Sequence, residues 1–482
     1  MQYEPVIGLE IHAQLLTTTK IFCGCSTVVE APANSHVCPV CLGLPGALPV
    51  LNREAVDQAI KAGLALNCTI QRRSIFARKN YFYPDLPKGY QISQYEQPLA
   101  TDGHLELTTG GMTSRVGIIR VHMEEDAGKS LHEGFLDSQR KTYLDFNRSG
   151  VPLIEIVTHP DLRSAAAAAE FFRRLREILV AIGVNDGNME EGSLRCDANV
   201  SVRPQGSERL GVKAEVKNLN SFRFLEQALE YEIQRQVTVV SGGGRVTQET
   251  RLWDSDAHQT VSMRSKEEAH DYRYFPDPDL PALVVTDARV QGLRALLPEL
   301  PAARRQRLMA AYTLSEREVS ALESTDLVAY FEQTARATGQ PRAAFNWVSG
   351  AVAHQKKALG AEFDLGRVPG DALAGLIALV DQGRISNSVA KEVFERMYES
   401  GRTAEDLVRA EGLAQIDDRG ALLAAIRGVL EQHADAVGQY RAGKSNALGF
   451  LVGQVMKTTG GKANPRLVNE LLRAELDATT IG

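Results

Sequence analysis

Four cysteines lie close together near the N-terminus, in the pattern C-x-C, twelve residues, then C-x-x-C (Cys23, Cys25, Cys38 and Cys41). Two closely spaced pairs of thiolates are the ligands that tetrahedral zinc requires, and a turn brings the pairs together. Four thiolates fill every position around the ion and leave none for water or substrate. The spacing therefore predicts a structural zinc knuckle over residues 23–41; the alternative is four buried thiols without a metal.

Acidic and basic side chains recur along runs of alternating polar and apolar residues at 6–15, 193–203 and 212–217. Successive side chains of a strand point to opposite faces, so each run predicts a β-strand with one apolar and one polar face. The polar faces carry these residues: Glu10, His12, Arg195, Asp197, Asn199 and Lys217. A half-buried sheet with a solvated face is the simpler interpretation. The repetition of Asp, Asn, Arg, Glu and His favours a chemical role.

Further carboxylates lie in or beside apolar runs. Glu124, Glu125 and Asp126 end one strand-like run, and Glu155 lies inside the apolar sequence LeuIleGluIleVal. Such an acid needs a partner, because burying an unpaired carboxylate is costly. Clustered carboxylates with a histidine suit Mg²⁺ or Mn²⁺, and nearby lysines and arginines would neutralise phosphate charge in phosphoryl transfer. The pattern alone leaves a metal–phosphate site and a solvated sheet face equally open.

Composition narrows the class of protein. The 482 residues include 54 Lys and Arg against 60 Asp and Glu, a formal net charge of −6. This balance excludes a histone-like nucleic-acid binder but allows a local RNA-binding patch. No apolar run reaches the roughly 18 residues of a membrane span, and the N-terminus lacks the features of a signal peptide. We therefore expect a cytoplasmic protein with no membrane partner, and six cysteines are too few for a disulfide scaffold.

The elements that must position these residues change character along the chain. Short alternating runs broken by turn residues favour antiparallel sheet with some helices in the first part. After Pro298 and Pro301 the sequence becomes alanine-rich with helical periodicity, and Ser315 with Glu318 resembles a capping box. We predict an α+β fold with three domains: a sheet-containing domain at 1–292, an all-α helical domain at 293–408 and a small α-helical tail at 409–482.

Residues 438–445 match G-x-x-x-x-G-K-[ST], the pattern of a phosphate-binding loop. Such a loop follows a strand and opens a helix. The preceding residues Leu422, Ile426 and Val429 have helical spacing, and the pattern fixes only four positions. We therefore predict no nucleotide site there.

Several long segments resemble one family, the B subunit of the tRNA-dependent amidotransferase that acts on glutamyl-tRNA(Gln) or aspartyl-tRNA(Asn). Beside the four cysteines, the segments that carry the resemblance are 8–15, 79–94, 144–157, 191–203, 215–222, 271–281 and 443–457. The resemblance runs along nearly the whole chain, and segments of this length are far more specific than a short motif.

The resemblance implies a cradle-shaped catalytic domain, a helical domain and a mobile helical tail. It implies that the subunit uses ATP to phosphorylate the side-chain carboxylate of a mischarged aminoacyl-tRNA. Ammonia then displaces the phosphate and gives Gln-tRNA or Asn-tRNA. An amidase A subunit would release this ammonia from glutamine, and a small C subunit would hold the two larger subunits together.

The resemblance also implies roles for individual residues. Those expected to hold Mg²⁺ or Mn²⁺ are Glu10, His12, Glu125 and Glu155. Those expected around ATP phosphates and substrate are Lys79, Lys88, Arg195, Asp197, Asn199 and Lys217, with ATP assigned to Lys79, Lys88, Arg195 and Lys217. Alternation along the strand places Glu124, and not Glu125, on the face of His122, so the choice of Glu125 rests on resemblance and either acid remains a candidate ligand.

The end segment of the resemblance contains basic residues that could hold tRNA phosphates: Lys444, Lys457, Lys462 and Arg466. Such contacts position an RNA without reading its sequence. A solvated helical surface explains any one of them equally well.

Two other functions compete with the ligase. A noncatalytic tRNA-binding adaptor would not need convergent carboxylates, and a small-molecule amide ligase would not need the helical domain and tail. The sequence has no serine-rich amidase loop, and neither Cys68 nor Cys196 looks like a glutaminase nucleophile. We therefore expect the ammonia to come from another chain.

Overall fold

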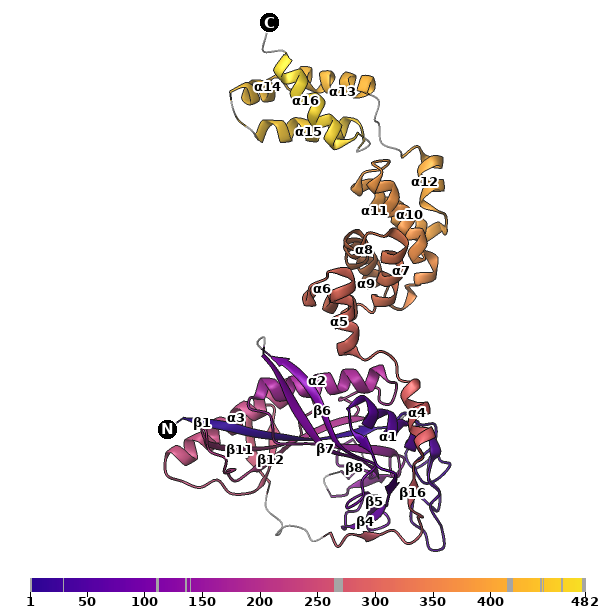
Figure 1. Cartoon of the computed structure of the whole chain (residues 1–482), viewed down its shortest axis with the longest axis vertical. Helices are drawn as coiled ribbons and strands as arrows, with labels where there is room; N and C mark the ends of the chain where they lie inside the picture. The colour runs from indigo at the N-terminus through magenta and orange to yellow at the C-terminus, as the bar shows by residue number, and fades with distance from the viewer. Residues whose placement is uncertain are drawn as a thin grey trace. The chain divides into compact units, whose positions relative to one another are not determined.

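A computed structural model describes residues 2–28, 30–109, 112–134, 137–138, 140–263, 272–413, 419–442, 444, 446–460 and 463–478. The chain forms two compact units, Met1–Ala303 and Arg304–Gly482, which we describe separately (Figure 1). The described strands all belong to the first unit, and the described part of the second is helical. The expected combination of a large sheet with a helical C-terminal region is confirmed. The division into three domains stays a prediction.

The elements of the N-terminal unit are β1 (Tyr3–Gln14), α1 (Arg53–Ala65), β2 (Thr69–Ile70), β3 (Arg73–Ser74), β4 (Ala77–Asn80), β5 (Tyr90–Ser93), β6 (Ala100–Thr109), β7 (Met112–Glu125), β8 (Lys129–Leu131), β9 (Tyr143–Asp145), β10 (Pro152–Thr158), α2 (Ala165–Ala181), β11 (Leu194–Pro204), β12 (Ala214–Lys217), α3 (Phe222–Ser241), β13 (Thr250–Asp254), β14 (Gln259–Ser262), β15 (Phe275–Pro276), β16 (Leu283–Val284) and α4 (Asp287–Ala295).

A nine-stranded sheet organises this unit, in the order β14-β13-β12-β11-β1-β10-β7-β6-β2. Neighbouring strands are antiparallel, as expected, except that β12 and β13 run parallel. Parallel neighbours need a crossover connection, and helix α3 supplies it between these two strands. Smaller sheets join β15, β4 and β5, β16 and β3, and β8 and β9.

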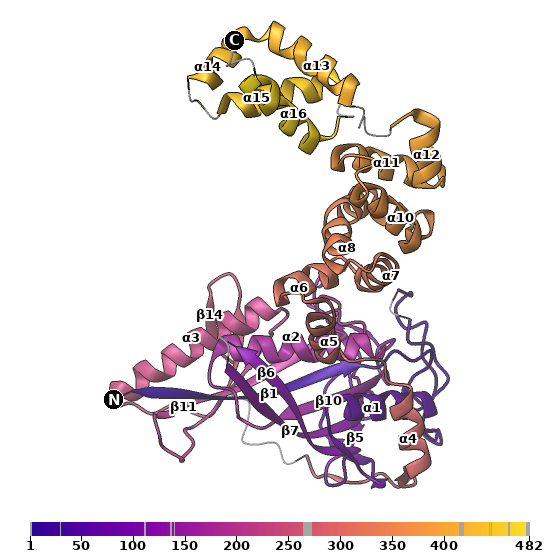
Figure 2. The same cartoon turned by 45° about the horizontal axis from the view of Figure 1, so that its top comes forward.

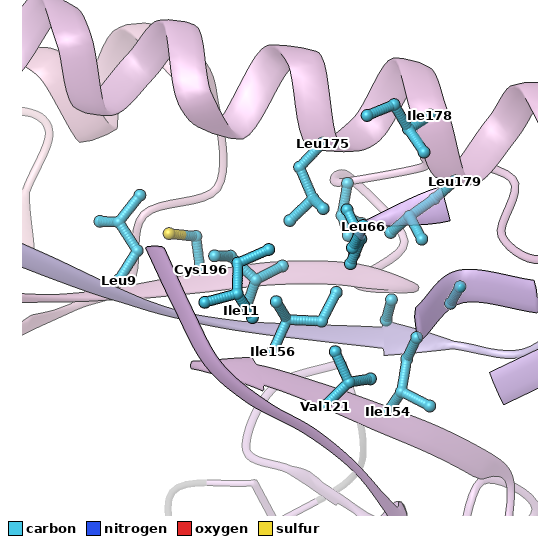
Figure 3. Close-up of a cluster of buried hydrophobic side chains, with 14 of the residues drawn as sticks. Leu9, Ile11, Leu66, Val121, Ile154, Ile156, Leu175, Ile178, Leu179 and Cys196 are labelled. Carbon is cyan, nitrogen blue, oxygen red and sulfur yellow. The ribbon is translucent and has the colours of Figure 1, made fainter. Parts of the chain in front are cut away.

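Helices α2 and α3 cover the apolar face of the large sheet. Figure 3 shows Leu175 and Leu179 of α2 pointing toward the sheet, from which Ile11 and Ile156 point back. The apolar faces predicted from alternation are buried, at most 7% exposed: Ile7, Leu9, Ile11, Ala13, Leu15, Leu194, Cys196, Ala198, Val200 and Val202. Burying a large apolar side chain contributes roughly 1.5–3 kcal/mol. This packing fixes the strand faces, so the polar side chains between them turn the other way.

The remaining helices follow in order, with one π-helical turn (η1) and two 3₁₀ turns (η2 and η3): α5 (Pro301–Tyr312), α6 (Glu316–Ser324), α7 (Val328–Thr338), α8 (Pro341–Trp347), η1 (Val348–Val352), α9 (Ala353–Leu359), η2 (Gly360–Glu362), η3 (Leu365–Arg367), α10 (Gly370–Asp381), α11 (Asn387–Ser400), α12 (Ala404–Glu411), α13 (Arg419–Gln432), α14 (Ala434–Arg441), α15 (Asn446–Thr458) and α16 (Pro465–Ala478).

These helices, drawn in a second view in Figure 2, contain two separate apolar clusters of buried side chains. One lies between residues 308 and 408 and the other between 422 and 476. The predicted capping box is present at α6, where Ser315 and Glu318 each bind the other's backbone N–H. Residues 438–441 of the phosphate-loop pattern lie within helix α14, and no described strand comes before them in this unit; Gly443 and Ser445 lie outside the described residues. Among the described helices, none is both long and apolar enough to cross a bilayer.

Candidate functional site

Four neighbouring strands align polar side chains in one row on the polar face of the sheet. Arg195 of β11 lies opposite His12 of β1, His12 lies opposite Glu155 of β10, and Glu155 lies opposite His122 of β7. Directly opposed residues on one face of an antiparallel pair have close side chains. The register therefore brings together groups that are far apart in the sequence.

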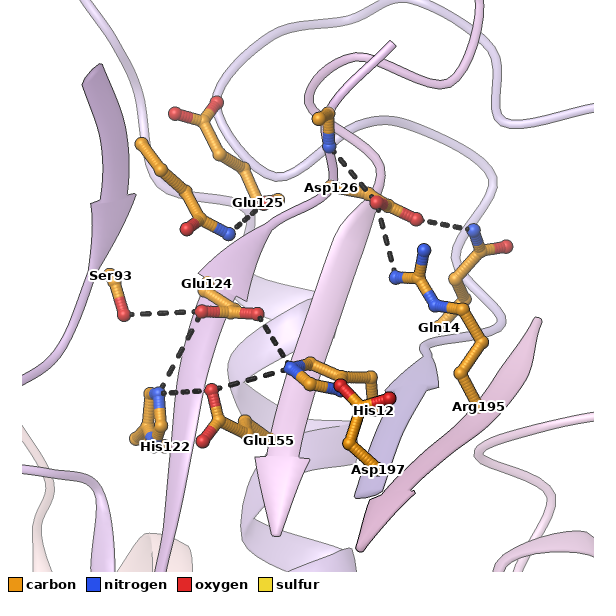
Figure 4. Close-up of polar contacts among 12 residues, drawn as sticks. His12, Gln14, Ser93, His122, Glu124, Glu125, Asp126, Glu155, Arg195 and Asp197 are labelled. Carbon is orange, nitrogen blue, oxygen red and sulfur yellow. Dashed lines mark hydrogen bonds and ion pairs between the residues drawn. The ribbon is translucent and has the colours of Figure 1, made fainter. Parts of the chain in front are cut away.

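A compact cluster of two acids and two histidines forms at the centre of this row (Figure 4). His12 Nε2 lies 3.4 Å from Glu155 Oε2 and 3.7 Å from Glu124 Oε1. His122 Nε2 lies 3.4 Å from Glu155 Oε2 and 3.8 Å from Glu124 Oε2. Ser93 donates a hydrogen bond of 3.3 Å to Glu124. Ligand atoms of His12, Glu124 and Glu155 lie within 4.8 Å of one another, so they could hold one metal ion.

Charge within this cluster is balanced by the histidines. Burial opposes a charge on His122, but Glu155 and Glu124 outweigh it and raise its pKa to about 9. The pKa of His12 is raised in the same way, against its burial, by Glu155 and Glu124. Burial likewise opposes the charge of Glu155, but the two histidines hold its pKa well below the usual range. With no cation bound, the Glu155 carboxylate therefore lies ionised beside the His122 imidazolium.

A cavity of about 300 Å³ opens next to the cluster, lined by His12 and Glu124 and by the cations Lys79, Arg148 and Arg195. Asp126 positions two of these cations. Its carboxylate accepts a 3.2 Å hydrogen bond from Arg195 and lies 3.7 Å from Arg148 Nε.

Asp126 is itself held in its charged form. Burial opposes that charge, but Arg195 and Arg148 outweigh burial and lower the pKa of Asp126. Gln14 donates a further hydrogen bond of 2.7 Å to the same carboxylate. The cavity thus combines fixed positive charge with the acidic cluster, an arrangement suited to phosphate oxygens.

A second group of charges continues along the same sheet face. Lys217 Nζ lies 2.8 Å from Asp197 and 2.9 Å from Glu215. Asn199 donates a hydrogen bond of 2.9 Å to Glu10. Burial and the charges of Glu155 and Glu215 raise the pKa of Glu10.

The four clustered cysteines also come together, within 4.8 Å of one another. The sulfurs of Cys38 and Cys41 are 3.9 Å apart. Four sulfurs about 2.3 Å from a tetrahedral zinc ion would be about 3.8 Å apart, so the arrangement fits the ion. A hydrogen bond from Cys23, aided by the Cys38 backbone and the charge of Lys20, holds the pKa of Cys41 well below its usual range against burial.

Comparison with known proteins decides the family. A family model described as the GatB/GatE catalytic domain matches residues 5–291, and one described as the GatB domain matches residues 329–476. The chain belongs to the GatB/GatE family. The family resemblance inferred from the sequence is therefore confirmed.

This member of the GatB/GatE family is similar to curated proteins named as the B subunit of aspartyl/glutamyl-tRNA(Asn/Gln) amidotransferase. It is 52% identical to the Chlorobaculum tepidum protein over 481 residues, 99% of this chain and 100% of the relative. It is 52% identical over 473 residues to the protein of Thermodesulfovibrio yellowstonii, and 52% identical over 476 residues to that of Carboxydothermus hydrogenoformans. Both matches cover 98% of this chain and 99% of the relative.

Two residues expected at the metal and phosphate site, Glu125 and Lys88, lie apart from the cluster of His12, Glu124 and Glu155. Glu125 lies opposite Pro152, on the other face of β7 from Glu124, and Figure 4 shows it turned away from His12. Its carboxylate accepts a 2.8 Å hydrogen bond from the backbone N–H of Ile92 and pairs with Lys88. Both Lys88 and Glu125 line a separate cavity of about 200 Å³ beside the cysteine cluster. Strand alternation is the physical reason: adjacent residues cannot share one face.

The other expected residues of the catalytic face divide into two groups. The first lies in the cluster or its cavity: His12, Glu124, Glu155, Lys79, Arg195 and Asp197. The second lies further along the same polar face: Glu10, Asn199 and Lys217. In the second unit, Lys444, Lys457 and Arg466 are exposed, and Lys462 lies outside the described residues.

Sequence reasoning missed several residues of the site. His122 lies on the same face of β7 as Glu124, so alternation carried a signal for it. Glu215 likewise alternates with Lys217 in β12. Asp126 follows the end of β7, and Arg148 lies between β9 and β10. For Asp126 and Arg148 no periodic signal exists, because neither lies in a regular element.

Proposed function

We propose that this chain is the B subunit of a tRNA-dependent amidotransferase, acting on Glu-tRNA(Gln), Asp-tRNA(Asn) or both. The side-chain carboxylate of the mischarged amino acid attacks the γ-phosphate of ATP and releases ADP. Ammonia then adds to the acyl phosphate and expels inorganic phosphate, leaving the amide. Phosphorylation is needed because an oxide ion is too poor a leaving group. The convergence of His12, Glu124 and Glu155 beside three cations is the observation that carries this proposal.

These three residues would hold Mg²⁺ or Mn²⁺. The separations of 3.4 and 3.7 Å from His12 to the two carboxylates are slightly longer than the about 3.0 Å between neighbouring oxygen or nitrogen ligands about 2.1 Å from an octahedral ion, so small shifts of these side chains would admit the ion. An ion held there would offset the negative charge of the phosphate groups. Glu10 lies further along the same strand face, where it would serve as an outer partner of the site.

The cations of the cavity have a separate task. Lys79, Arg148 and Arg195 would bind the phosphates of ATP and offset the charge that spreads over the transferring group. Asp126 keeps Arg195 in place through its hydrogen bond. At the other end of the polar face, Lys217, Asp197 and Asn199 would orient the substrate.

The ammonia is proposed to come from a partner. Glutamine hydrolysis needs an exposed nucleophile, and the two cysteines outside the cluster are buried at 7% and 2% exposure (Cys68 and Cys196). Burial raises the pKa of Cys68 to about 12 and that of Cys196 well above its usual range. An amidase A subunit supplying ammonia, with a small C subunit joining the two, completes the proposed enzyme, which would act in the cytoplasm.

The finer features of the fold belong to the same proposal. The N-terminal domain, 1–292, would be the catalytic cradle, with a structural Zn²⁺ held by Cys23, Cys25, Cys38 and Cys41. The helical domain, 293–408, would connect it to a mobile tail at 409–482. Basic residues of the tail would contact tRNA phosphates: Lys444, Lys457, Lys462 and Arg466.

Single-turnover ATP cleavage by the complete complex tests the catalytic role. Mischarged tRNA is expected to stimulate cleavage, whereas free glutamate or aspartate is not. Equal stimulation by the free amino acids would instead indicate a small-molecule ligase, and tRNA binding without cleavage would indicate an adaptor. The isolated chain should form amide with ammonium but not with glutamine; robust turnover of glutamine by it alone would contradict the need for a partner.

The tRNA-binding residues of the tail have their own test. Replacing Lys444, Lys457 and Arg466 together by alanine should weaken tRNA binding. The slope of log affinity against log salt should fall by about 1 for every phosphate that the protein no longer neutralises. An unchanged slope would show that these side chains are a solvated surface.

A further inference from the structure

A lysine with no exposed surface lies beside the cysteine cluster. Lys20 is 0% exposed and is among the largest fully buried side chains of the described residues. Its ammonium donates to the backbone oxygens of His36 (2.7 Å) and Phe146 (3.2 Å), and to the sulfur of Cys41 (3.6 Å). A lysine ammonium has three N–H donors, so each has an acceptor.

The charge of this ammonium is not matched by an acid. Among the described residues, no carboxylate lies within ion-pair distance of Lys20, and its two carbonyl partners supply dipoles only. Lys88, which lines the same cavity, is paired with Glu125. A buried charge is costly unless an opposite charge accompanies it. Among the groups that Lys20 contacts, only the sulfur of Cys41 can carry a negative charge.

The sulfur atoms can supply that charge only as thiolates. Four neutral thiols carry none, whereas four thiolates around one divalent ion carry a net charge of about −2. The backbone N–H of Cys38 donates a 3.1 Å hydrogen bond to Cys41 Sγ, as it would to a thiolate. We propose that Lys20 is the internal counter-ion of a metal-loaded tetrathiolate and strengthens its hold on the ion. This inference rests on the proposed zinc cluster and adds a residue that is not a ligand.

The same ammonium joins the cluster to the wall of the catalytic cavity. Its contact with the Phe146 oxygen fixes the segment after β9. Within that segment Asn147 accepts a 2.8 Å hydrogen bond from the His36 N–H, and Ser149 donates one of 3.3 Å to the Cys41 oxygen. Arg148, between them, lines the catalytic cavity. Lys20 is therefore a positioning residue, since it contacts a metal ligand and the backbone next to Arg148.

Zinc release from the full chain tests the proposal. Lys20→Met removes the charge and keeps a long apolar side chain, and zinc should pass to a competing chelator with an affinity loss of about tenfold or more, as for other outer partners of metal ligands. Lys88→Met is the matched control, because it removes a partly buried lysine of the same cavity whose charge Glu125 balances. It should release zinc as the unaltered chain does. Equal retention of zinc by Lys20→Met and the unaltered chain would overturn the proposal.

Thermal melting separates charge from packing. With zinc bound, Lys20→Met should have a lower Tm than the unaltered chain. After zinc is stripped, this difference should shrink or reverse, because Lys20 of the unaltered chain then lies beside fewer negative charges. Equal losses with and without zinc would mean that Lys20 only packs, which also overturns the proposal. If the unaltered chain binds no zinc and its Co²⁺ form shows no thiolate charge-transfer band, the zinc cluster itself fails and this inference with it.

Discussion

The N-terminal unit holds two clusters of side chains suited to metal ions, and they are built in different ways. The cysteine cluster comes from one segment, residues 23–41. The carboxylate cluster takes His12, Glu124 and Glu155 from three strands. It forms only if β1, β10 and β7 pair in one register, because a slip of one residue turns every side chain of a strand to the other face. The first cluster therefore depends on a local loop and the second on the whole sheet.

The two clusters also balance their charge differently. The carboxylates have two histidines beside them that neutralise charge when no ion is bound. Among the described residues, the cysteines have one buried cation in contact, Lys20. An empty carboxylate cluster can therefore stay folded, whereas the cysteine loop should depend more strongly on its ion.

The largest expected effect is a difference between substitutions of two neighbouring acids, Glu124 and Glu125. Glu124→Gln should lower single-turnover amide formation by about 10²–10³-fold, because it removes charge from the centre of the site. It should also weaken Mn²⁺ binding, measured by electron paramagnetic resonance. Glu125→Gln should leave Mn²⁺ binding unchanged, since Glu125 faces the other cavity. Loss of Mn²⁺ binding in Glu125→Gln alone would show that the register of β7 is different in solution.

This pair of acids shows what the sequence could predict and what it could not. Alternation alone placed Glu124 on the same face of β7 as His122, and the register confirms this face. Which of the two acids binds an ion stays a prediction. The strand faces of residues 6–15 and 193–203 were predictable for the same reason. The partner of each strand was not, because pairing between distant segments leaves no local pattern in one sequence. Asp126 was noted among the clustered acids, but its contacts with Arg148 and Arg195 were beyond prediction, because Asp126 and Arg148 lie outside regular elements.

A smaller effect is expected on the stability of the N-terminal unit when a cysteine of the cluster is replaced. Cys41→Ser should abolish stoichiometric zinc and lower the free energy of unfolding of the N-terminal unit by about 3 kcal/mol, because loss of a metal is among the more damaging changes. Mn²⁺ binding at the carboxylates should persist. Urea denaturation and elemental analysis measure these outcomes. Cys68→Ala, a buried cysteine outside the cluster, should keep its zinc; if Cys41→Ser also keeps zinc, the cysteines are not the ligands.

The histidines predict a pH dependence for the metal-free protein. Burial opposes a charge on His122, but Glu155 and Glu124 raise its pKa to about 9, from an ordinary value near 6.5. A raised pKa stabilises the fold fully below the unfolded value, and this contribution is lost as pH rises through the folded value. Tm of the metal-free chain should therefore fall by several degrees between about pH 6.5 and pH 9.

Two variants isolate the source of that fall. His122→Asn should remove most of the pH dependence, whereas His132→Asn, at an exposed histidine of the same unit, should keep it. An equal slope in His122→Asn and the unaltered chain would show that the cluster is not charged in this way.

The smallest expected effect tests whether the cysteine loop is fully local. Asn147 lies more than a hundred residues away, yet its side chain donates to the Pro32 oxygen and accepts from the His36 N–H, both at 2.8 Å. Asn147→Ala removes both hydrogen bonds and should lower the free energy of unfolding by about 1–2 kcal/mol. Zinc content should not change, because no ligand is touched.

Asn147→Asp completes this test, because it keeps the acceptor for His36 and loses the donor to Pro32. Its destabilisation should be intermediate if the two hydrogen bonds contribute separately. Zinc affinity measured for both variants then distinguishes two structures of the loop. If affinity is unchanged, the cysteines hold their geometry without the segment after β9, and the cluster is local as its spacing indicates. If zinc affinity falls together with stability, the cysteine loop takes its shape from the segment after β9. The cysteine cluster then also depends on distant residues, as the carboxylate cluster does, though to a smaller extent.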